Sequence, residues 1–98
     1  MKKVFISIPM RGLERSEIIS KQGEILAHVN NKIGEPVMLV ESFLDGNADM
    51  KPLECLGESL KRMAHADLAV FAKGWAEARG CAIEHMCAEK YGIPILDL

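Results

Sequence analysis

The chain has 98 residues, of which 49% are hydrophobic and 27% are charged, and its formal net charge is −2. This length suffices for one core, so we expect a single domain over residues 1–98. The composition provides no basic surface for nucleic acid or an anionic membrane, and no apolar run approaches the length of a membrane span. A free nucleotide or nucleoside remains compatible with it, because one or two placed cations can bind a small anion.

The start of the chain and its cysteines bear on cellular location. Residues 4–8 are an apolar run that faintly imitates a signal peptide, but the run is short, a proline follows it, and no small-residue cleavage site is present. We interpret it as a strand buried on both faces. Cys55, Cys81 and Cys87 are odd in number and lack CxxC spacing, which favours reduced thiols in a cytoplasm.

Apolar runs alternate with helical periodicity along the whole chain. Strands are expected at residues 4–8, 36–40, 67–72 and 93–96. The first helix is expected between an N-cap at Ser16 and a stop at Gly34. Such alternation predicts an α/β three-layer sandwich of the flavodoxin or Rossmann-like type, with a four-stranded parallel sheet in the order 2-1-3-4.

The second helix is expected to begin at Pro52, where the missing N–H of proline has no cost. Its apolar stripe comprises Leu53, Leu56, Leu60 and Met63. Residues 41–51 before it are interpreted as a loop, which is long for so small a domain, and loops of this length often act as lids.

The predicted strand order indicates where a ligand would bind. In such sheets the site lies beyond the carboxyl ends of the strands where the order reverses, here between the first and third strands. The residues expected there are Ser7, Pro9, Met10, Arg11, Gly12, Lys73, Gly74 and Trp75. Asp67 lies at the amino end of its strand, so we give it a capping role.

The last helical pattern, residues 80–91, places a carboxylate within its own apolar sector. At roughly 100° per residue, Glu84 lies among five apolar side chains, whereas His85 and Glu89 lie outside the sector. The sector comprises Cys81, Ile83, Cys87, Ala88 and Tyr91. Glu84 is either a structural residue bonded to backbone or to Arg79, or a nucleophile or general base at the crevice.

Three further features each have more than one reading. Arg11-Gly12 precedes a helix and could bind an anion through the guanidinium and backbone N–H groups, or Arg11 is a plain surface arginine. Trp75 could stack on a nucleobase or cover the sheet edge. Cys81 and His85, at i and i+4, could ligate a metal or form a nucleophilic pair, but small core residues explain the cysteines more simply. We therefore expect no metal and no cofactor.

Three segments together resemble a known family. "VFISIPMRG", "AHADLAVFAKGW" and "GWAEARGCAIEHMCAEKYGIPI" are similar to the nucleoside 2-deoxyribosyltransferase-like superfamily, and nearest to its short bacterial and phage branch of unknown function. The resemblance runs in order through nearly the whole chain. It implies cleavage or transfer at the N-glycosidic bond of a nucleoside or nucleotide, and assembly into homodimers or larger rings.

The resemblance also implies roles for particular residues. The family's nucleophilic glutamate matches Glu84, which would form a covalent glycosyl intermediate. Arg11-Gly12 matches an Arg-Gly pair that contacts the 5′-phosphate in the nucleotide-hydrolysing branch. Ser59 stands where the family commonly has an aspartate that supports the nucleophile or substrate. This departure keeps a second hypothesis open, in which the chain is a nucleotide-binding module without turnover.

Overall fold

The structure, a computed structural model, describes residues 1–40 and 51–98. Its strands are β1 (Lys2–Ser7), β2 (Val37–Leu39), β3 (Leu68–Phe71) and β4 (Ile95–Asp97). Its helices are α1 (Arg15–Ile33), α2 (Pro52–Met63) and α3 (Arg79–Lys90), with a 3₁₀ turn η1 (Trp75–Glu77) before α3. The loop and lid predicted over residues 41–51 lie outside the described residues except for Lys51.

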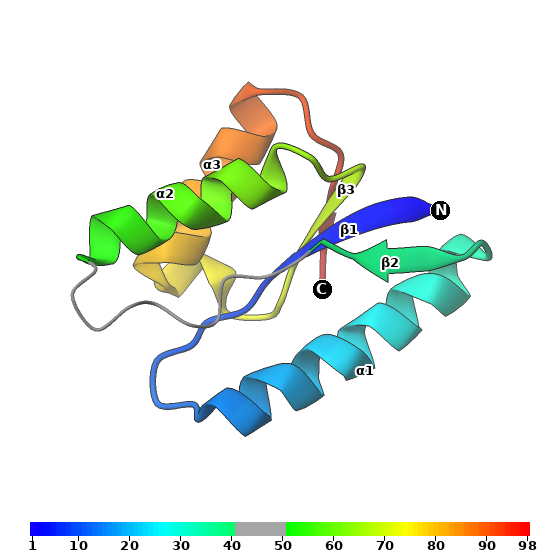
Figure 1. Ribbon diagram of the computed structural model, residues 1–98, viewed down its shortest axis with the longest axis horizontal. Helices are drawn as coiled ribbons and strands as arrows, with labels where there is room; N and C mark the ends of the chain where they lie inside the picture. Colours follow the sequence, from blue (N-terminus) through cyan, green and yellow to red (C-terminus); the bar gives the residue numbers. More distant parts are fainter. Residues whose placement is uncertain (41–50) are drawn as a thin grey trace.

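The four strands form one parallel sheet in the order β2-β1-β3-β4, as predicted. Val4 pairs with both Leu39 and Leu68, so β1 is a central strand. Helix α1 covers one face of the sheet, and α2 and α3 cover the other (Figure 1). The predicted three-layer α/β architecture is therefore confirmed.

Alternation along β1 divides the core into two layers. Val4 and Ile6 pack with Val29 of α1, whereas Phe5 packs with Met63 of α2 and buried residues of α3. Because successive side chains of a strand point to opposite faces, Ser7 shares the face of Phe5 and points toward α2 and α3. The strand buries a hydroxyl at the end of an otherwise apolar run, on the side where α3 passes.

The predicted ends of helices are only partly right. Gly34 ends α1 in the left-handed conformation, with φ 76°, and its N–H donates to the Asn30 carbonyl, as expected. The N-cap is Glu14, however, and not Ser16. The Glu14 N–H donates to the Glu17 carboxylate at 3.4 Å, a reciprocal cap that starts the helix earlier than the serine would.

Helix α2 begins at Pro52 as predicted, but its apolar stripe is not wholly buried. Met63 is buried at the end of the helix, and Leu56 and Leu60 are half-buried, whereas Leu53 in the first turn is 77% exposed. A 12-residue helix is about 18 Å long, and the four residues of β3 span about 13 Å, so the first turn extends past the strand.

The amino edge of the sheet has a structural role. The Asp67 carboxylate accepts a hydrogen bond from the Lys3 backbone N–H at 2.8 Å, which agrees with the predicted capping role. No helix in the described part of the chain is both long and apolar enough to cross a membrane.

Candidate functional site

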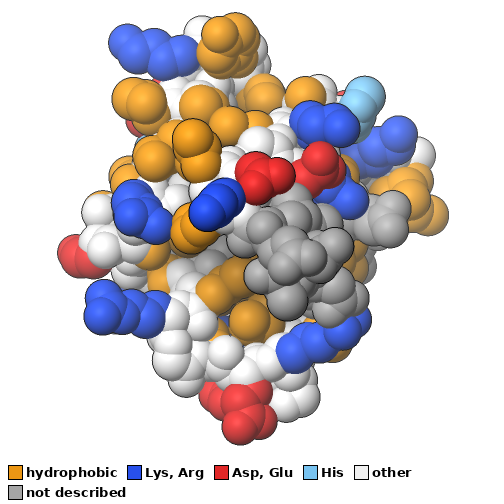
Figure 2. Space-filling view, turned by 60° about the vertical axis from the view of Figure 1, so that its left-hand side comes forward, with side chains coloured by type: hydrophobic (Ala, Val, Ile, Leu, Met, Phe, Trp, Pro, Cys, Tyr) orange, Lys and Arg blue, Asp and Glu red, His pale blue; other side chains and the backbone are white. Residues whose placement is uncertain are grey.

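A pocket of about 630 Å³ opens at the carboxyl end of β1, between α2 and the start of α3. This volume is in the range of small-molecule sites. The described residues that line it are Ile8, Pro9, Met10, Arg11, Pro52, Cys55, Leu56, Ser59, Glu77, Ala78, Arg79, Gly80, Cys81 and Glu84. Figure 2 brings forward the side of the molecule that is at the left of Figure 1, where hydrophobic, basic and acidic side chains share one face.

A second depression of about 560 Å³ lies at the amino edge of the sheet and includes Asp67 and Glu35 in its lining. Its charged side chains already have partners, because Asp67 accepts a hydrogen bond from the Lys3 backbone N–H and Glu35 forms an ion pair with Lys2 at 3.5 Å. Parallel α/β sheets place their ligands at the opposite edge. We therefore assign the candidate site to the pocket at the carboxyl edge.

Glu84 is the most deeply buried charged residue on the wall of this pocket, with 7% of its surface exposed. Its Oε1 accepts a hydrogen bond of 2.7 Å from the Ser7 hydroxyl, which β1 directs toward α3. Burial raises the pKa of the Glu84 carboxyl, and hydrogen bonds from Ser7 and Ser59 partly oppose this rise. The Ser7 hydroxyl of β1 thus positions the carboxyl, and Ser59 of α2 favours its charged form.

The alternative partner expected for Glu84 is not found. No ion pair joins Glu84 to Arg79 among the residues that the structure describes, although both line the pocket. The position of Glu84 in the apolar sector of α3 was predicted correctly, because Cys81 and Ala88 are buried beside it. Tyr91, assigned to the same sector, is 84% exposed, since α3 ends at Lys90 and Tyr91 lies beyond its last turn.

Ser59 of α2 lines the pocket, as the helix pattern allowed. Its hydroxyl acts on Glu84 by favouring the charged carboxylate. The neighbouring Glu58 is directed elsewhere and accepts a hydrogen bond of 3.1 Å from Arg62 one turn later. At the described part of this wall, α2 therefore supplies a hydroxyl and no carboxylate.

The end of β1 and the loop after it contribute as predicted, with two exceptions. Pro9, Met10 and Arg11 line the pocket, whereas Ser7, which is buried behind the wall against Glu84, and Gly12 do not. Gly12 instead makes a turn with φ 81°, a conformation that favours glycine. The turn leads into α1 and leaves Arg11 exposed at the mouth of the pocket.

The loop after β3 was predicted to line the pocket, but it does not. Gly74 does approach the loop after β1, since a Cβ placed there would lie 3.7 Å from Pro9 Cγ. Lys73, Gly74 and Trp75 are nevertheless absent from the described wall. Gly74 has φ 92°, and the turn after it carries Trp75 away from the pocket. The predicted placement of Trp75 in the crevice is therefore wrong.

Trp75 packs on a histidine that the helical pattern placed outside the core. Its ring stacks on His85 with centroids 3.7 Å apart and planes 1° apart, and it meets Phe71 edge to face at 6.0 Å. His85 is consequently buried, with 7% exposure. The expectation that His85 lies outside the buried sector fails because η1 and β4 add a second buried side to α3.

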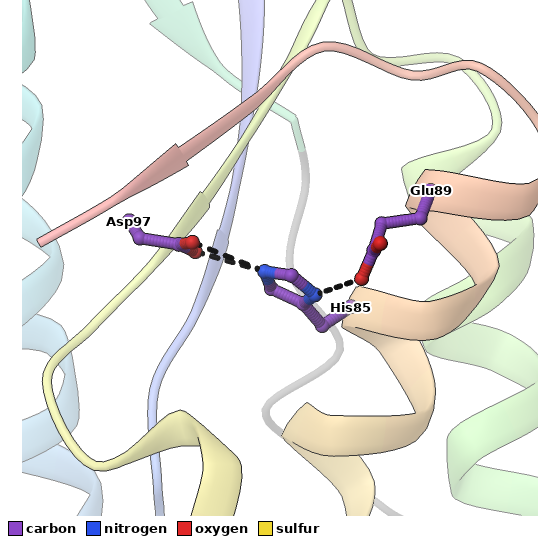
Figure 3. A network of polar contacts seen from close by, with 3 residues as sticks. All are labelled: His85, Glu89 and Asp97. Carbon is purple, nitrogen blue, oxygen red and sulfur yellow. Dashed lines mark hydrogen bonds and ion pairs between the residues drawn. The ribbon is translucent and has the colours of Figure 1, made fainter.

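Both ring nitrogens of His85 contact carboxylates (Figure 3). Nδ1 lies 2.8 Å from Glu89 Oε1, and Nε2 lies 2.9 Å from Asp97 Oδ1. A neutral imidazole has one N–H, so both contacts are N–H donations only in the protonated ring. The cluster of Trp75, His85, Glu89 and Asp97 ties η1, α3 and β4 together, and we call it the His85 cluster.

Cys81 and His85 do not form the reactive pair considered from the sequence. Burial raises the pKa of the Cys81 thiol, a hydrogen bond with Ser7 lowers it, and the charge of Glu84 raises it further. A thiol in this setting is a poor source of thiolate. Among the described residues, no group of three or more potential ligands could hold a metal ion.

Sequence reasoning missed several residues of the pocket wall. Cys55 and Leu56 come from α2, and Glu77 and Arg79 come from the segment that joins η1 to α3. The order of the strands identifies the loops near the site, but it does not identify the turns of α2 and α3 that complete the wall of the pocket. Arg79 had been considered only as a partner of Glu84.

The fold and the pocket define an α/β protein with a buried carboxyl at the carboxyl edge of a parallel sheet. Comparisons with protein-family models, with curated proteins and with solved structures found no match to this chain.

Proposed function

We propose that this protein cleaves, or transfers across, the N-glycosidic bond of a nucleoside 5′-monophosphate or a nucleoside, with Glu84 as the nucleophile. The observation that carries the proposal is the Glu84 carboxyl, buried on the pocket wall and held at 2.7 Å by Ser7. A carboxyl whose pKa is shifted by burial at a pocket is a candidate functional group. In its ionised form, which the Ser7 and Ser59 hydroxyls favour, it can act as a nucleophile. The resemblance to the nucleoside 2-deoxyribosyltransferase-like superfamily supports the same role.

The reaction would proceed by two displacements. In the first, a Glu84 oxygen attacks the anomeric carbon, and the electron pair of the C–N bond leaves with the base. In the second, water or another base attacks the same carbon and releases Glu84, which decides between hydrolysis and transfer. Two displacements retain the configuration of the sugar. Ser7 and Ser59 would hold the carboxylate in line with that carbon.

The charges at the mouth of the pocket favour a phosphorylated substrate. Arg11 and Arg79 line the same pocket, and Gly80 and Cys81 bring the N-terminal turn of α3 to its wall. Guanidinium groups and the first N–H groups of a helix are the ordinary ligands of a phosphate. We therefore prefer a nucleoside 5′-monophosphate to a free nucleoside, with Arg11 as the main phosphate ligand.

One observation favours a second function, a nucleotide-binding module without turnover. Where the resemblance implies an aspartate on α2, this chain has Ser59, whose hydroxyl favours the charged form of Glu84 and lowers its pKa. A hydroxyl at this position would not protonate a departing base as a carboxylic acid does. Such a module would use the same pocket and the same arginines.

Incubation with a panel of nucleosides and 5′-monophosphates, with chromatography for free base, tests the proposal. Base release that is lost in Glu84→Gln supports catalysis. Tight binding by calorimetry without base release supports the binding module instead. If no member of the panel bound to the protein and none released its base, both functions would be overturned.

We also propose that the protein acts in the cytoplasm as a homodimer or a larger homo-oligomer. Relatives implied by the resemblance close each crevice with a neighbouring subunit, and several apolar side chains are exposed here, among them Leu53 and Tyr91. Light scattering behind a sizing column tests this assembly. A mass near that of the 10.8 kDa chain at micromolar concentration would contradict it.

A further inference from the structure

The pocket contains a second carboxylate that the proposed reaction has not used. Glu77, in η1, lines the same pocket as Glu84. These are the two carboxylate residues among the described residues of the wall. A glycosidic bond that breaks with retention ordinarily requires two carboxyl groups, one as nucleophile and one as acid and base.

The two carboxylates have different surroundings. Glu84 is buried and bonded to hydroxyl groups, whereas Glu77 is exposed to solvent. A nucleophile benefits from a fixed position beside hydroxyl groups that favour its ionised form, and an acid and base must reach the departing base and the attacking water at the open side of the pocket. The environments therefore suit the two groups to complementary roles.

Glu77 is not engaged elsewhere in the described part of the molecule. No side-chain hydrogen bond or ion pair occupies its carboxylate there, although Arg79 lies two residues away. Glu58, by contrast, is bound by Arg62. The Glu77 carboxylate thus remains available to a ligand at the pocket mouth.

The backbone that carries Glu77 is held firmly. The Glu77 N–H donates to the Gly74 carbonyl at 3.2 Å, and the Ala78 N–H donates to the Trp75 carbonyl at 3.2 Å. Trp75 in turn stacks on His85, which contacts Asp97 at the end of β4 (Figure 3). The His85 cluster thereby fixes the turn that places Glu77 at the pocket, as a catalytic group on a short loop requires.

We propose that Glu77 is the general acid and base of the reaction, in place of the acid that α2 lacks at Ser59. This inference rests on the proposed function. In the first step the protonated Glu77 carboxyl gives its proton to a nitrogen of the departing base as Glu84 bonds to the anomeric carbon. In the second, the Glu77 carboxylate takes a proton from the attacking water, or from the N–H of an attacking base, and Glu84 leaves the sugar with its electron pair.

The test compares Glu77→Gln and Glu84→Gln on two substrates with the same sugar 5′-phosphate. One carries a natural base, which needs protonation to leave. The other carries a p-nitrophenoxy group, which leaves as p-nitrophenolate without being protonated. Glu77→Gln should slow release of the natural base by about 10²-fold or more. On the activated substrate it should give a burst of p-nitrophenolate equal to the enzyme concentration, followed by slow turnover that azide accelerates, because azide attacks without a base.

Glu24→Gln, which removes the same charge from the exposed surface of α1, is the matched control and should behave as the wild type. Unchanged release of the natural base by Glu77→Gln overturns the inference. The inference is also overturned if Glu77→Gln loses activity equally on both substrates, with no burst and no rescue by azide. In that case Glu84→Gln would still be inactive on both, and the proposed function would stand. Wild-type activity in Glu84→Gln, or no release by the wild-type protein, overturns the proposed function and this inference with it.

Discussion

Glu84 and His85 are consecutive residues of α3 with equal burial, but the protein engages them very differently. His85 has carboxylates at both ring nitrogens, an indole stacked on its face and Phe71 at its edge. Glu84 has hydroxyl partners on one side and a pocket on the other. A saturated polar group in a core is typical of a structural role, and an incompletely enclosed one at a pocket is typical of a site.

This difference arises from the geometry of the helix. Adjacent residues on a helix point about 100° apart, so one faces β1 and α2 while the next faces η1 and β4. The same turn of α3 can therefore hold a reactive group and anchor it. We expect substitutions at the two positions to separate activity from stability.

The largest effect is expected for Glu84→Gln on glycosidic cleavage. The amide fits the same space and can still meet the Ser7 hydroxyl, but it cannot form the glycosyl ester. The rate of base release should fall by at least about 10³-fold, with the far-UV circular dichroism unchanged. Retention of wild-type turnover would show that Glu84 is as structural as His85.

His85→Ala should give the largest loss of stability, about 3 kcal/mol in the free energy of unfolding measured with urea. The substitution removes the stacking partner of Trp75 and separates Asp97 from α3. Met86→Ala is the matched control, because Met86 is the next residue of α3 and is 51% exposed. A loss no greater than that of the control would show that the His85 cluster does not hold η1.

Arg11→Ala should weaken binding of a nucleoside 5′-monophosphate by about 2 kcal/mol, the value of a charged hydrogen bond to phosphate. Binding of the matching nucleoside should change much less, because the missing contact is to the phosphate. Calorimetry with the two ligands measures both effects. An equal loss for both would assign Arg11 to general packing of the loop after β1.

The surroundings of Glu84 and those of His85 also differ in how far they can be predicted from the sequence. Strand order and the burial of Glu84 were predictable, because they depend on local periodicity and on the handedness of parallel connections. The pairing of Ser7 with Glu84 was available in principle, since alternation in β1 assigns Ser7 to the face of Phe5. This step requires only that the parity of one strand be followed to its last residue.

The His85 cluster was not predictable in the same way. The i,i+4 spacing of His85 and Glu89 can be read from the sequence, but Asp97 and Trp75 reach the ring through β4 and η1. The direction of Trp75 depends on a turn at Gly74 that any glycine permits and none dictates. Long-range contacts of this kind carry no periodic signal, and Trp75 was therefore assigned to the wrong side of the loop.

The smallest effect expected is on the pH dependence of stability, and it tests whether burial dominates at Glu84. Because burial raises the pKa of Glu84 above its ordinary value, the folded state binds the proton more tightly than the unfolded chain. The contribution of Glu84 to stability is then complete below the pKa of the unfolded chain and is lost as the pH rises through the pKa of the folded state. Gln does not ionise, so Glu84→Gln should be more stable than the wild type at about pH 8, and this gain should shrink toward about pH 4, near the ordinary glutamate pKa.

Urea unfolding of both proteins across this range measures the effect, with Glu24→Gln as the control for loss of one negative charge. Glu24 is exposed on α1, so its substitution should give a difference that hardly varies with pH. If Glu84→Gln were instead less stable than the wild type at neutral pH, the hydrogen bonds from Ser7 and Ser59 would outweigh the cost of burial. Glu84 would then be satisfied by its surroundings as fully as His85, and the contrast between the two residues would no longer support a catalytic role.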